Sequence, residues 1–317
     1  MKLLAKAGFS KQTSFKKKKA VVDREEKIQG FLMAVIPFIG FLAFTAFPLG
    51  LTIFVSFTDL HSYDLTTLQW CGFDNYVKLF GLPMFKDAVV NTLYFLLSVP
   101  INLVSQLFIA NLLDKPENKT FKKIARLILY IPTIIGGVAV ALIWNWILEP
   151  NYGVFNSLLS ALGLEKIGFT TTKEWFMPSV LIIKWWSAGL NVLIFQSALA
   201  NVDNSLKEAA RIDGASERRI FFSVVIPQIS PMILYTLMTE CIAGFQEMSV
   251  MQIIAGNGVG PSNSAVTLSY LMYRMTNENI YTEGFGLASA LGIVLGIIVI
   301  IVSVTINTIS KKFVSYD

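Results

Sequence analysis

Ionisable side chains lie inside two long apolar stretches of this sequence. Lys184 interrupts an apolar block at 175–202, and Glu240 and Glu247 interrupt another at 220–254. A charge within an apolar span is costly, so such a residue is a functional hypothesis by default. The seven-residue spacing of Glu240 and Glu247 places both carboxylates on one face of a helix. We therefore expect all of these charged groups to face protein or water.

Polar and aromatic side chains accompany these charges in the same two stretches. Recognition of a hydroxyl-rich solute needs paired hydrogen-bond donors and acceptors and an aromatic face. The candidates for a substrate pathway are Lys184, Trp185, Trp186, Asn191, Gln196, Glu240, Gln246 and Glu247. Similar depth predicts an ion pair between Lys184 and Glu247, with Glu240 left to line a deeper cavity. A purely structural ion pair, or tryptophans that anchor the outer interface, would account for the same residues.

The sequence lacks the groupings of residues that catalysis or metal binding requires. It holds one histidine, His61, and two cysteines, Cys71 and Cys241, which would lie at different membrane depths. It contains no Gly-rich phosphate loop followed by Lys and Ser or Thr. We therefore expect no catalytic residue, metal or cofactor in this chain. An intramembrane enzyme is disfavoured, because it would need a nucleophile with a base or a metal cluster.

The composition is that of an integral membrane protein. Of the 317 residues, 54% are hydrophobic and 15% are charged, against about 25% charged in a soluble domain. The apolar residues gather in blocks long enough to cross a bilayer core of about 30 Å. Backbone groups in lipid must be satisfied within their own segment, which predicts an all-α protein. The six predicted transmembrane helices are 28–58, 88–113, 127–148, 175–202, 220–254 and 284–310.

The distribution of Lys and Arg predicts the orientation in the membrane. Of the 26 such residues, 20 fall on the side that holds both termini and the loops at 114–126 and 203–219. The positive-inside rule makes that side cytoplasmic. The net charge of +5 is then explained by topology, so no nucleic-acid partner is expected. The predicted organisation is a basic tail at 1–27, a first transmembrane helix with its outer loop at 28–86, a five-helix core at 87–309 and a tail at 310–317.

A short helix over 205–212 is predicted in the loop between the fourth and fifth spans. Asn204 or Ser205 can cap its N-terminus by accepting hydrogen bonds from free backbone N–H groups. Glu208 lies in the first turns, where a carboxylate suits the capping preferences and the positive end of the helix dipole. These local preferences agree with one another and favour a rigid element rather than a loose loop.

The residues that follow predict how this helix ends and what it can do. Ala209 and Ala210 leave one flank narrow, so that another protein surface can approach closely. Asp213-Gly214 is a turn signal, because glycine adopts positive φ without steric cost. The chain then returns to the membrane at Phe221. A short rigid helix between two spans has the shape of a docking element.

This loop resembles the EAA loop of ABC importer permeases, the binding-protein-dependent inner-membrane components. The family pattern is EAA, two residues, DGA, and then Phe and Ile-Pro or Leu-Pro at fixed distances. The matching residues are Glu208, Ala209, Ala210, Asp213, Gly214, Ala215, Phe221, Ile226, Pro227 and Pro231. The resemblance implies that the EAA loop, at 203–231, couples the chain to an ATPase. The coupling residues that it implies are Glu208, Ala209, Ala210, Asp213, Gly214 and Pro227.

Further segments are similar to the sugar-type branch of this family, whose best-known members import maltose and related oligosaccharides. They include Cys71 to Tyr76, Glu149 to Gly153 and Gly189 to Asn191. The resemblance implies a carbohydrate permease in a bacterial cytoplasmic membrane, paired with a second, homologous permease subunit in a heterodimer. It also implies two cytoplasmic ATPase subunits, which bind ATP and Mg, and an extracytoplasmic sugar-binding protein. The sequence departs from the family's F-Q-x-F-D pattern at Phe245 to Ser249.

Two other transport functions remain open on the residues alone. An ABC importer could carry another small polar solute, such as a glycerol phosphate or a polyamine. Phosphate cargo would favour arginine-rich spans, and the predicted spans hold no arginine. An ion-coupled secondary transporter could use Glu240 and Glu247 as a proton relay, but inverted repeats are not evident and the EAA loop would have no purpose.

Overall fold

The computed structural model describes residues 24–61, 64–114, 118–187, 189–278, 284–312 and 314. Contacts divide the chain into two units, Met1–Leu51 and Thr52–Asp317, and each is described by itself. The basic run from Lys16 to Lys19, which belongs to the predicted N-terminal tail, lies outside the described residues. The predicted tail at 310–317 also lies partly outside them.

The first unit is helical throughout its described part. Helix α1 (Arg24–Phe41) runs into a π-helical turn, η1 (Leu42–Ala46), and then into α2 (Phe47–Val55), which continues into the second unit. In η1, the backbone N–H of Phe47 donates to the carbonyl of Leu42, five residues back. The wider turn ends two residues before Pro48, whose ring would otherwise clash with the carbonyl four residues earlier. The proline is thus accommodated without ending the helix.

The second unit is also built from helices. Within the described ranges, β pairing is limited to one isolated bridge between Thr58 and Trp70. Two 3₁₀ turns, η2 (Leu65–Thr67) and η4 (Pro261–Asn263), and a π-helical turn, η3 (Phe221–Val225), separate some of the helices. The helices are α3 (Asp74–Gly81), α4 (Pro83–Leu96), α5 (Ser98–Asp114), α6 (Lys119–Ile135), α7 (Gly137–Ile147), α8 (Val154–Ala161), α9 (Lys173–Trp186), α10 (Gly189–Ala200), α11 (Asn204–Ile212), α12 (Glu217–Ile220), α13 (Ile226–Phe245), α14 (Ser249–Ile254), α15 (Leu268–Asn277) and α16 (Gly284–Ser310).

Four continuous helical segments are long and apolar enough to cross a membrane. They are Gln29–Val55, Pro83–Asp114, Glu217–Phe245 and Gly284–Ser310. Two bent helix pairs bring the number to six if each pair is counted as one span. The all-helical membrane architecture predicted from the sequence is therefore observed, and the number of spans lies between four and six.

The third predicted span, 127–148, is not one straight helix. Helices α6 and α7 meet at an angle of 103° across Gly136. Gly136 has φ 87° and ψ 150°, a conformation that side-chain-bearing residues avoid. The fourth predicted span is also bent, by 45°, between α9 and α10. The fifth ends at Phe245, earlier than predicted, and α14 follows as a separate short helix.

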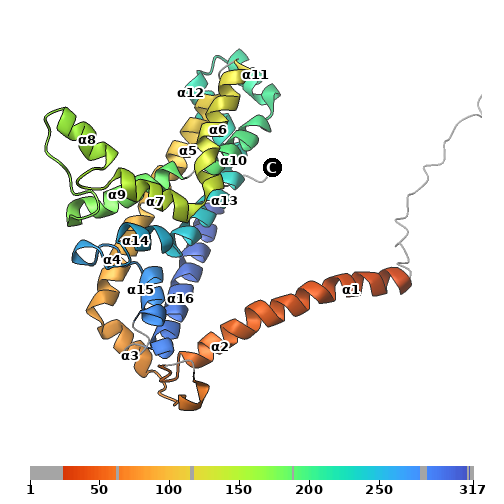
Figure 1. Cartoon of the computed structure of the whole chain (residues 1–317). Helices are drawn as coiled ribbons and strands as arrows, with labels where there is room; N and C mark the ends of the chain where they lie inside the picture. Colours follow the sequence, from red (N-terminus) through yellow and green to blue (C-terminus); the bar gives the residue numbers. More distant parts are fainter. Residues whose placement is uncertain are drawn as a thin grey trace, which may run out of the picture. The chain divides into compact units, whose positions relative to one another are not determined.

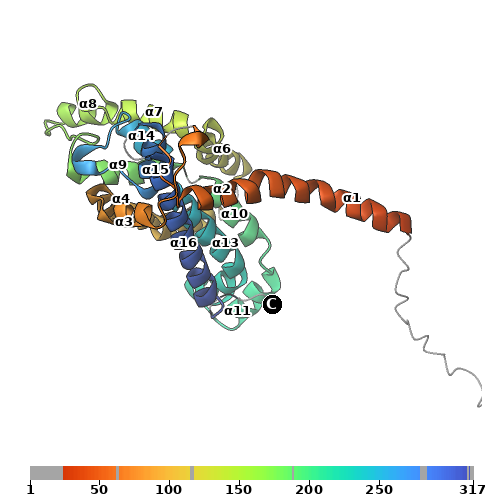
Figure 2. The ribbon, with the colours of Figure 1, turned by 90° about the horizontal axis from the view of Figure 1, so that it is seen from below.

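Hydrophobic clusters hold the second unit together. One joins α7, α9 and α14 around Phe176, and another joins α3, α4, α15 and α16 around Leu79 and Leu291. A third joins α5, α10 and α12 around Val192 and Ile220. In both views of the ribbon, the C-terminal end of α16 lies toward the end of the unit that holds α11 (Figures 1 and 2). The third cluster contains Ile220 of α12, and Ala210 of α11 packs against it, so both short helices pack on this cluster.

Candidate functional site

The helix predicted over 205–212 is present as α11 (Asn204–Ile212), and its N-terminus is capped by a residue that the sequence reasoning missed. The carboxylate of Asp203 accepts a hydrogen bond of 2.8 Å from the backbone N–H of Ser205. The prediction that Asn204 or Ser205 provides the cap is therefore wrong. Asp203 precedes the helix with extended backbone, the conformation that lets a short polar side chain reach back to the first free N–H groups.

The C-terminus of α11 closes on Gly214, as the turn signal predicted. Gly214 has φ +78° and follows the terminal residue Asp213. The backbone N–H of Ala215 donates to the carbonyl of Ala210 at 2.9 Å, and that of Gly214 donates to the carbonyl of Arg211 at 3.0 Å. This pair of bonds is the Schellman motif, which satisfies carbonyls that a helix end would otherwise leave unpaired. The Asp-Gly-Ala sequence thus produces a rigid stop.

The two flanks of α11 have opposite environments. Ala210 is half-buried and packs against the third hydrophobic cluster, together with Ala215. Glu208 and Ala209 are exposed, and Ile212 is 86% exposed. Among the described residues, the carboxylate of Glu208 has no hydrogen-bond or ion-pair partner. The outward flank therefore offers a free carboxylate, a small residue and an apolar side chain to another surface.

A continuous helical path connects α11 to the interior of the molecule. Arg211 forms an ion pair of 2.9 Å with Glu217, which ties α11 to α12. Helix α12 continues through the π-helical turn η3 into α13, so that one helical segment runs from Glu217 to Phe245. As in η1, the π-helical turn ends two residues before a proline, here Pro227. Pro227 therefore lies within a continuous helix whose turn widens to admit it, rather than at a sharp kink.

The predicted ion pair between Lys184 and Glu247 is present. Nζ of Lys184 lies 3.2 Å from Oε2 of Glu247, and the side chains are 29% and 14% exposed. Oε1 of Glu247 accepts a further bond of 3.2 Å from the backbone N–H of Val250, at the start of α14. The pair therefore joins the end of α9 to the segment between α13 and α14.

Glu240 binds two amide side chains. Nδ2 of Asn191 donates to its Oε1 at 2.5 Å, and Nε2 of Gln106 donates to the same atom at 2.6 Å. Gln106 is buried in α5 and was not among the predicted residues. A glutamine in an apolar span could have been noticed, but sequence alone does not indicate its partner. Oε2 of Glu240 and Oε1 of Gln106 are buried without a hydrogen-bond partner.

The other candidate pathway residues do not join this polar group. Gln196 is buried and accepts a hydrogen bond of 2.8 Å from Nε of Arg126, on α6. Nε1 of Trp185 donates to the hydroxyl of Ser105 at 2.8 Å. Trp186 packs edge-on against Trp144, and Gln246 is exposed.

A metal site would need at least three His, Cys, Asp or Glu side chains close together. The described part of the chain contains no such group. The polar side chains between the helices instead pair with one another. The arrangement can bind and orient a polar solute or fix the helices, and it supplies no nucleophile activated by a base.

Comparisons with known proteins identify the family and the fold. Residues 106–315 match the family described as "Binding-protein-dependent transport system inner membrane component". The probable ABC transporter permease protein YesP of Bacillus subtilis is 34% identical over 306 residues, which cover 95% of this chain and 96% of that protein. The diacetylchitobiose uptake system permease protein NgcF of Streptomyces coelicolor is 28% identical over 308 residues, covering 93% of this chain and 85% of that protein.

Solved structures include a similar fold. One chain of a bacterial ABC transporter involved in the import of the acidic polysaccharide alginate superimposes with a TM-score of 0.76. The match covers 92% of this chain and 98% of that chain at 24% sequence identity. At this level of identity the likeness establishes the architecture and leaves the substrate open.

Proposed function

Because the chain belongs to the family of binding-protein-dependent transport system inner membrane components, we propose that it forms half of the translocation pathway of an ATP-driven importer for a carbohydrate, an oligosaccharide in particular. The observation that carries the proposal is α11, a helix capped at both ends whose outward flank holds the unpaired Glu208. The carbohydrate assignment is supported by relatives such as the diacetylchitobiose permease.

The proposed complex contains other subunits. A second, homologous permease subunit completes the pathway, two ATPase subunits bind ATP and Mg, and an extracytoplasmic binding protein delivers the sugar. The chain itself is a transport subunit without catalytic residues. It lies in a bacterial cytoplasmic membrane with both termini inside. The basic loop that holds α11 and the end of α16, which Lys311 and Lys312 follow, lie toward the same end of the unit (Figure 1). This supports the orientation, because lysine and arginine residues concentrate on the cytoplasmic side of a membrane protein.

We propose that coupling passes through the coupling residues Glu208, Ala209, Ala210, Asp213, Gly214 and Pro227. Closure of the ATPase subunits moves α11 through a charge-assisted bond between Glu208 and an arginine or lysine of the ATPase. Gly214 keeps α11 rigid, and the ion pair between Arg211 and Glu217 passes the movement to α12. Helix α13 follows, because it is continuous with α12 through η3. The movement rocks the helices around a central pathway.

The proposed substrate pathway runs along α9, α10 and the end of α13. Its residues are Lys184, Trp185, Trp186, Asn191, Gln196, Glu240, Gln246 and Glu247. The strongest support comes from the two contacts between Lys184 and Glu247 and between Asn191 and Glu240. They bring donors and acceptors of several helices together, as sugar recognition requires. Gln196 is the least supported member, since it binds Arg126 instead.

The proposal is tested with the complex reconstituted in vesicles, by measuring ATP hydrolysis and sugar uptake with and without the binding protein. Glu208→Ala removes one proposed charge-assisted bond to the ATPase, and the loss of such a bond changes an equilibrium constant about tenfold or more. We expect binding-protein-stimulated hydrolysis and uptake to fall about tenfold or more while the membrane subunits remain assembled. Glu165→Ala, which removes an exposed carboxylate in the 149–174 loop, serves as the matched control.

Two results would reject the proposal. One is full coupling in the Glu208→Ala complex. The other is uptake that continues without ATPase subunits and stops when an ionophore collapses the ion gradient, which would identify a secondary transporter. A panel of oligosaccharides, glycerol phosphates and polyamines tested as ligands of the binding protein separates the carbohydrate assignment from the other solutes.

A further inference from the structure

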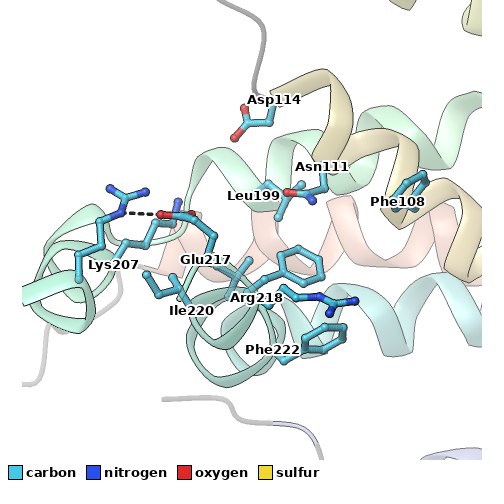
Figure 3. A pocket seen from close by; sticks show the side chains of 12 residues that line it. Phe108, Asn111, Asp114, Leu199, Lys207, Glu217, Arg218, Ile220 and Phe222 are labelled. Carbon is cyan, nitrogen blue, oxygen red and sulfur yellow. Dashed lines mark hydrogen bonds and ion pairs between the residues drawn. The ribbon is translucent and has the colours of Figure 1, made fainter. Parts of the chain in front are cut away.

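A pocket of about 510 Å³ opens between α5, α10, α11, α12 and η3 (Figure 3). Its lining comes from the last two turns of α5, from α11 and from the start of the segment that becomes α13. The pocket therefore lies where apolar spans meet the polar loop that carries the docking helix. Arg211 and Glu217, which belong to the proposed coupling path, line part of this pocket, but the proposed coupling does not require a ligand in it.

One wall of the pocket is apolar and faces away from the protein core. Phe108 of α5 is 60% exposed and Phe222 of η3 is 66% exposed, and both line the pocket. Both rings belong to helical segments that are apolar enough to cross a membrane. An exposed aromatic side chain on such a segment suits contact with lipid chains rather than with water.

Two basic side chains line the pocket at different places: Lys207 lies near the ion pair of Arg211 and Glu217, and Arg218 extends toward Phe222 (Figure 3). The acidic residues Asp114 and Glu217 line the pocket as well. Arg218 has no ion-pair partner among the described residues. Arg211 is engaged by Glu217, and their ion pair lies on the side of the pocket away from Phe108 and Phe222 (Figure 3). The charge of Arg218 thus remains available to a ligand beside the aromatic wall.

A further basic residue borders the pocket near Asp114. Nζ of Lys122, in the first turn of α6, donates to the backbone carbonyl of Asp114 at 2.6 Å, and Asp114 lines the pocket.

We propose that this pocket binds an anionic phospholipid of the cytoplasmic leaflet, with its phosphate at Arg218, on the side that faces Lys207, and its acyl chains along Phe222 and Phe108. An amphiphile matches an unpaired cation beside two exposed aromatic rings, whereas a soluble anion leaves those rings uncovered. Basic pockets between membrane helices on the cytoplasmic side suit anionic headgroups. The bound lipid would bridge α5 to α11 and α12, and so hold the docking helix against the membrane domain. The proposal goes beyond the transport function.

The test is carried out on the full complex with its ATPase subunits, purified in nanodiscs of phosphatidylcholine with one fifth phosphatidylglycerol. Native mass spectrometry then counts the phosphatidylglycerol that stays bound after transfer to detergent. The double variant Lys207→Gln, Arg218→Gln should retain about tenfold less phosphatidylglycerol, because each cation contributes to headgroup attraction. Arg219→Gln is the matched control, since Arg219 is the exposed neighbour that does not line the pocket.

A second variant separates charge from folding. Lys207→Arg, Arg218→Lys preserves both charges and should retain phosphatidylglycerol at the wild-type level. Equal retention by the double glutamine variant and by the wild type would overturn the proposal. So would loss of the lipid from the charge-preserving variant.

Two further outcomes address other occupants. Displacement of phosphatidylglycerol by millimolar inorganic phosphate or glycerol phosphate would mean that the pocket takes a soluble anion, and would overturn the lipid assignment. Selective retention by the permease subunits alone, but not by the full complex, would mean that the ATPase covers the pocket, and would overturn the proposal for the assembled transporter. Lipid retention is measured without sugar or ATP. A negative lipid result therefore does not reject the proposed transport function, and a negative transport result does not change the number of lipids counted.

Discussion

The carboxylate of Glu247 lies 3.2 Å from the ammonium of Lys184, on one side of the break between α9 and α10, while Glu240 receives the amide of Asn191 on the other side. The two carboxylates are seven residues apart on the chain and belong to α13 and its immediate continuation. Together they bind both halves of a bent span. The bend is thereby held by side chains from a different helix, which makes this region sensitive to single substitutions.

The ion pair of Lys184 and Glu247 yields a first prediction. Lys184→Met leaves Glu247 largely buried without its cation, and we expect a loss of about 1–3 kcal/mol in complex stability, less than for a fully buried pair. The double change Lys184→Met, Glu247→Met should restore assembly but not sugar uptake. Thermal unfolding of the purified complex and uptake in vesicles measure the two effects separately.

Glu247→Gln provides the complementary measurement for the same pair. It should weaken sugar-stimulated transport and leave assembly intact if Glu247 belongs to the substrate pathway. Full uptake by the double methionine variant would show that the pair is structural, and would remove both residues from the pathway.

Glu240 yields a second prediction, which depends on the unpaired oxygens around it. Glu240→Gln keeps an acceptor for the two amide donors, and its new N–H₂ group can donate to Oε1 of Gln106. The variant should therefore assemble as stably as the wild type. Glu240→Leu leaves the donors of Gln106 and Asn191 without an acceptor, at a cost of about 1–3 kcal/mol for each unpaired group.

The readout for Glu240 is the unfolding temperature of the purified complex for both variants. If Glu240→Gln lowers the unfolding temperature as much as Glu240→Leu, the negative charge itself is required, and the explanation through hydrogen bonds is wrong.

Gly214 yields a third prediction, with a control inside the same chain. A Cβ at Gly214 meets nothing within 4 Å, so Gly214→Ala is opposed only by the φ of +78°. The cost of that conformation for alanine is about 1–2 kcal/mol, and it is smaller for asparagine. We expect Gly214→Ala to reduce binding-protein-stimulated ATP hydrolysis, and Gly214→Asn to reduce it less.

Gly163 is the control because it ends α8 in the same way. It has φ +75° and open space around its Cβ position, and the N–H of Leu164 donates to the carbonyl of Leu159 at 2.9 Å. Gly163→Ala should therefore strain the backbone equally without affecting hydrolysis. Equal loss of hydrolysis in both alanine variants would mean that Gly214 acts through general stability and not through α11.

Asp203 yields a fourth prediction, on pH. The backbone N–H of Ser205 donates to the carboxylate and holds the pKa of Asp203 below its ordinary value. A lowered pKa in the folded state means that the cap stabilises α11 fully above the unfolded value of about 3.9. This contribution is lost only as the pH falls through the lower, folded value. Amide hydrogen exchange of α11 between pH 6 and pH 3 should show the helix opening only at the acid end.

Asp203→Asn separates the charge from the hydrogen bond, because asparagine is also a good N-cap. Exchange in α11 of this variant should lose its dependence on the ionisation of residue 203. An unchanged pH profile in Asp203→Asn would assign the acid-induced opening to another group.

Features that depend on neighbouring residues could be predicted from the sequence. The docking helix was predicted over 205–212 and is observed as Asn204–Ile212. Its stop at Gly214 was predicted from the Asp-Gly turn signal. Capping, turn formation and the apolar content of a span are determined over a few residues, and so they can be read along the chain. The cap itself was misplaced by one residue, since Asp203, Asn204 and Ser205 are all good caps and only backbone geometry selects among them.

Features that depend on which helices meet were decided by the tertiary structure. The bend of 103° at Gly136 could not be predicted, because a glycine in an apolar block is compatible with a straight helix as well as with a break. The ion pair of Lys184 and Glu247 could be inferred from equal depth, whereas the bond from Gln106 to Glu240 spans 134 residues and depends on α5 packing against α13. A helical membrane protein with a short helix capped at both ends could be predicted from the sequence, because both are local and compositional properties. The partners of its buried polar groups were decided only by the tertiary structure, because a buried donor takes whichever acceptor the packing brings within about 3 Å.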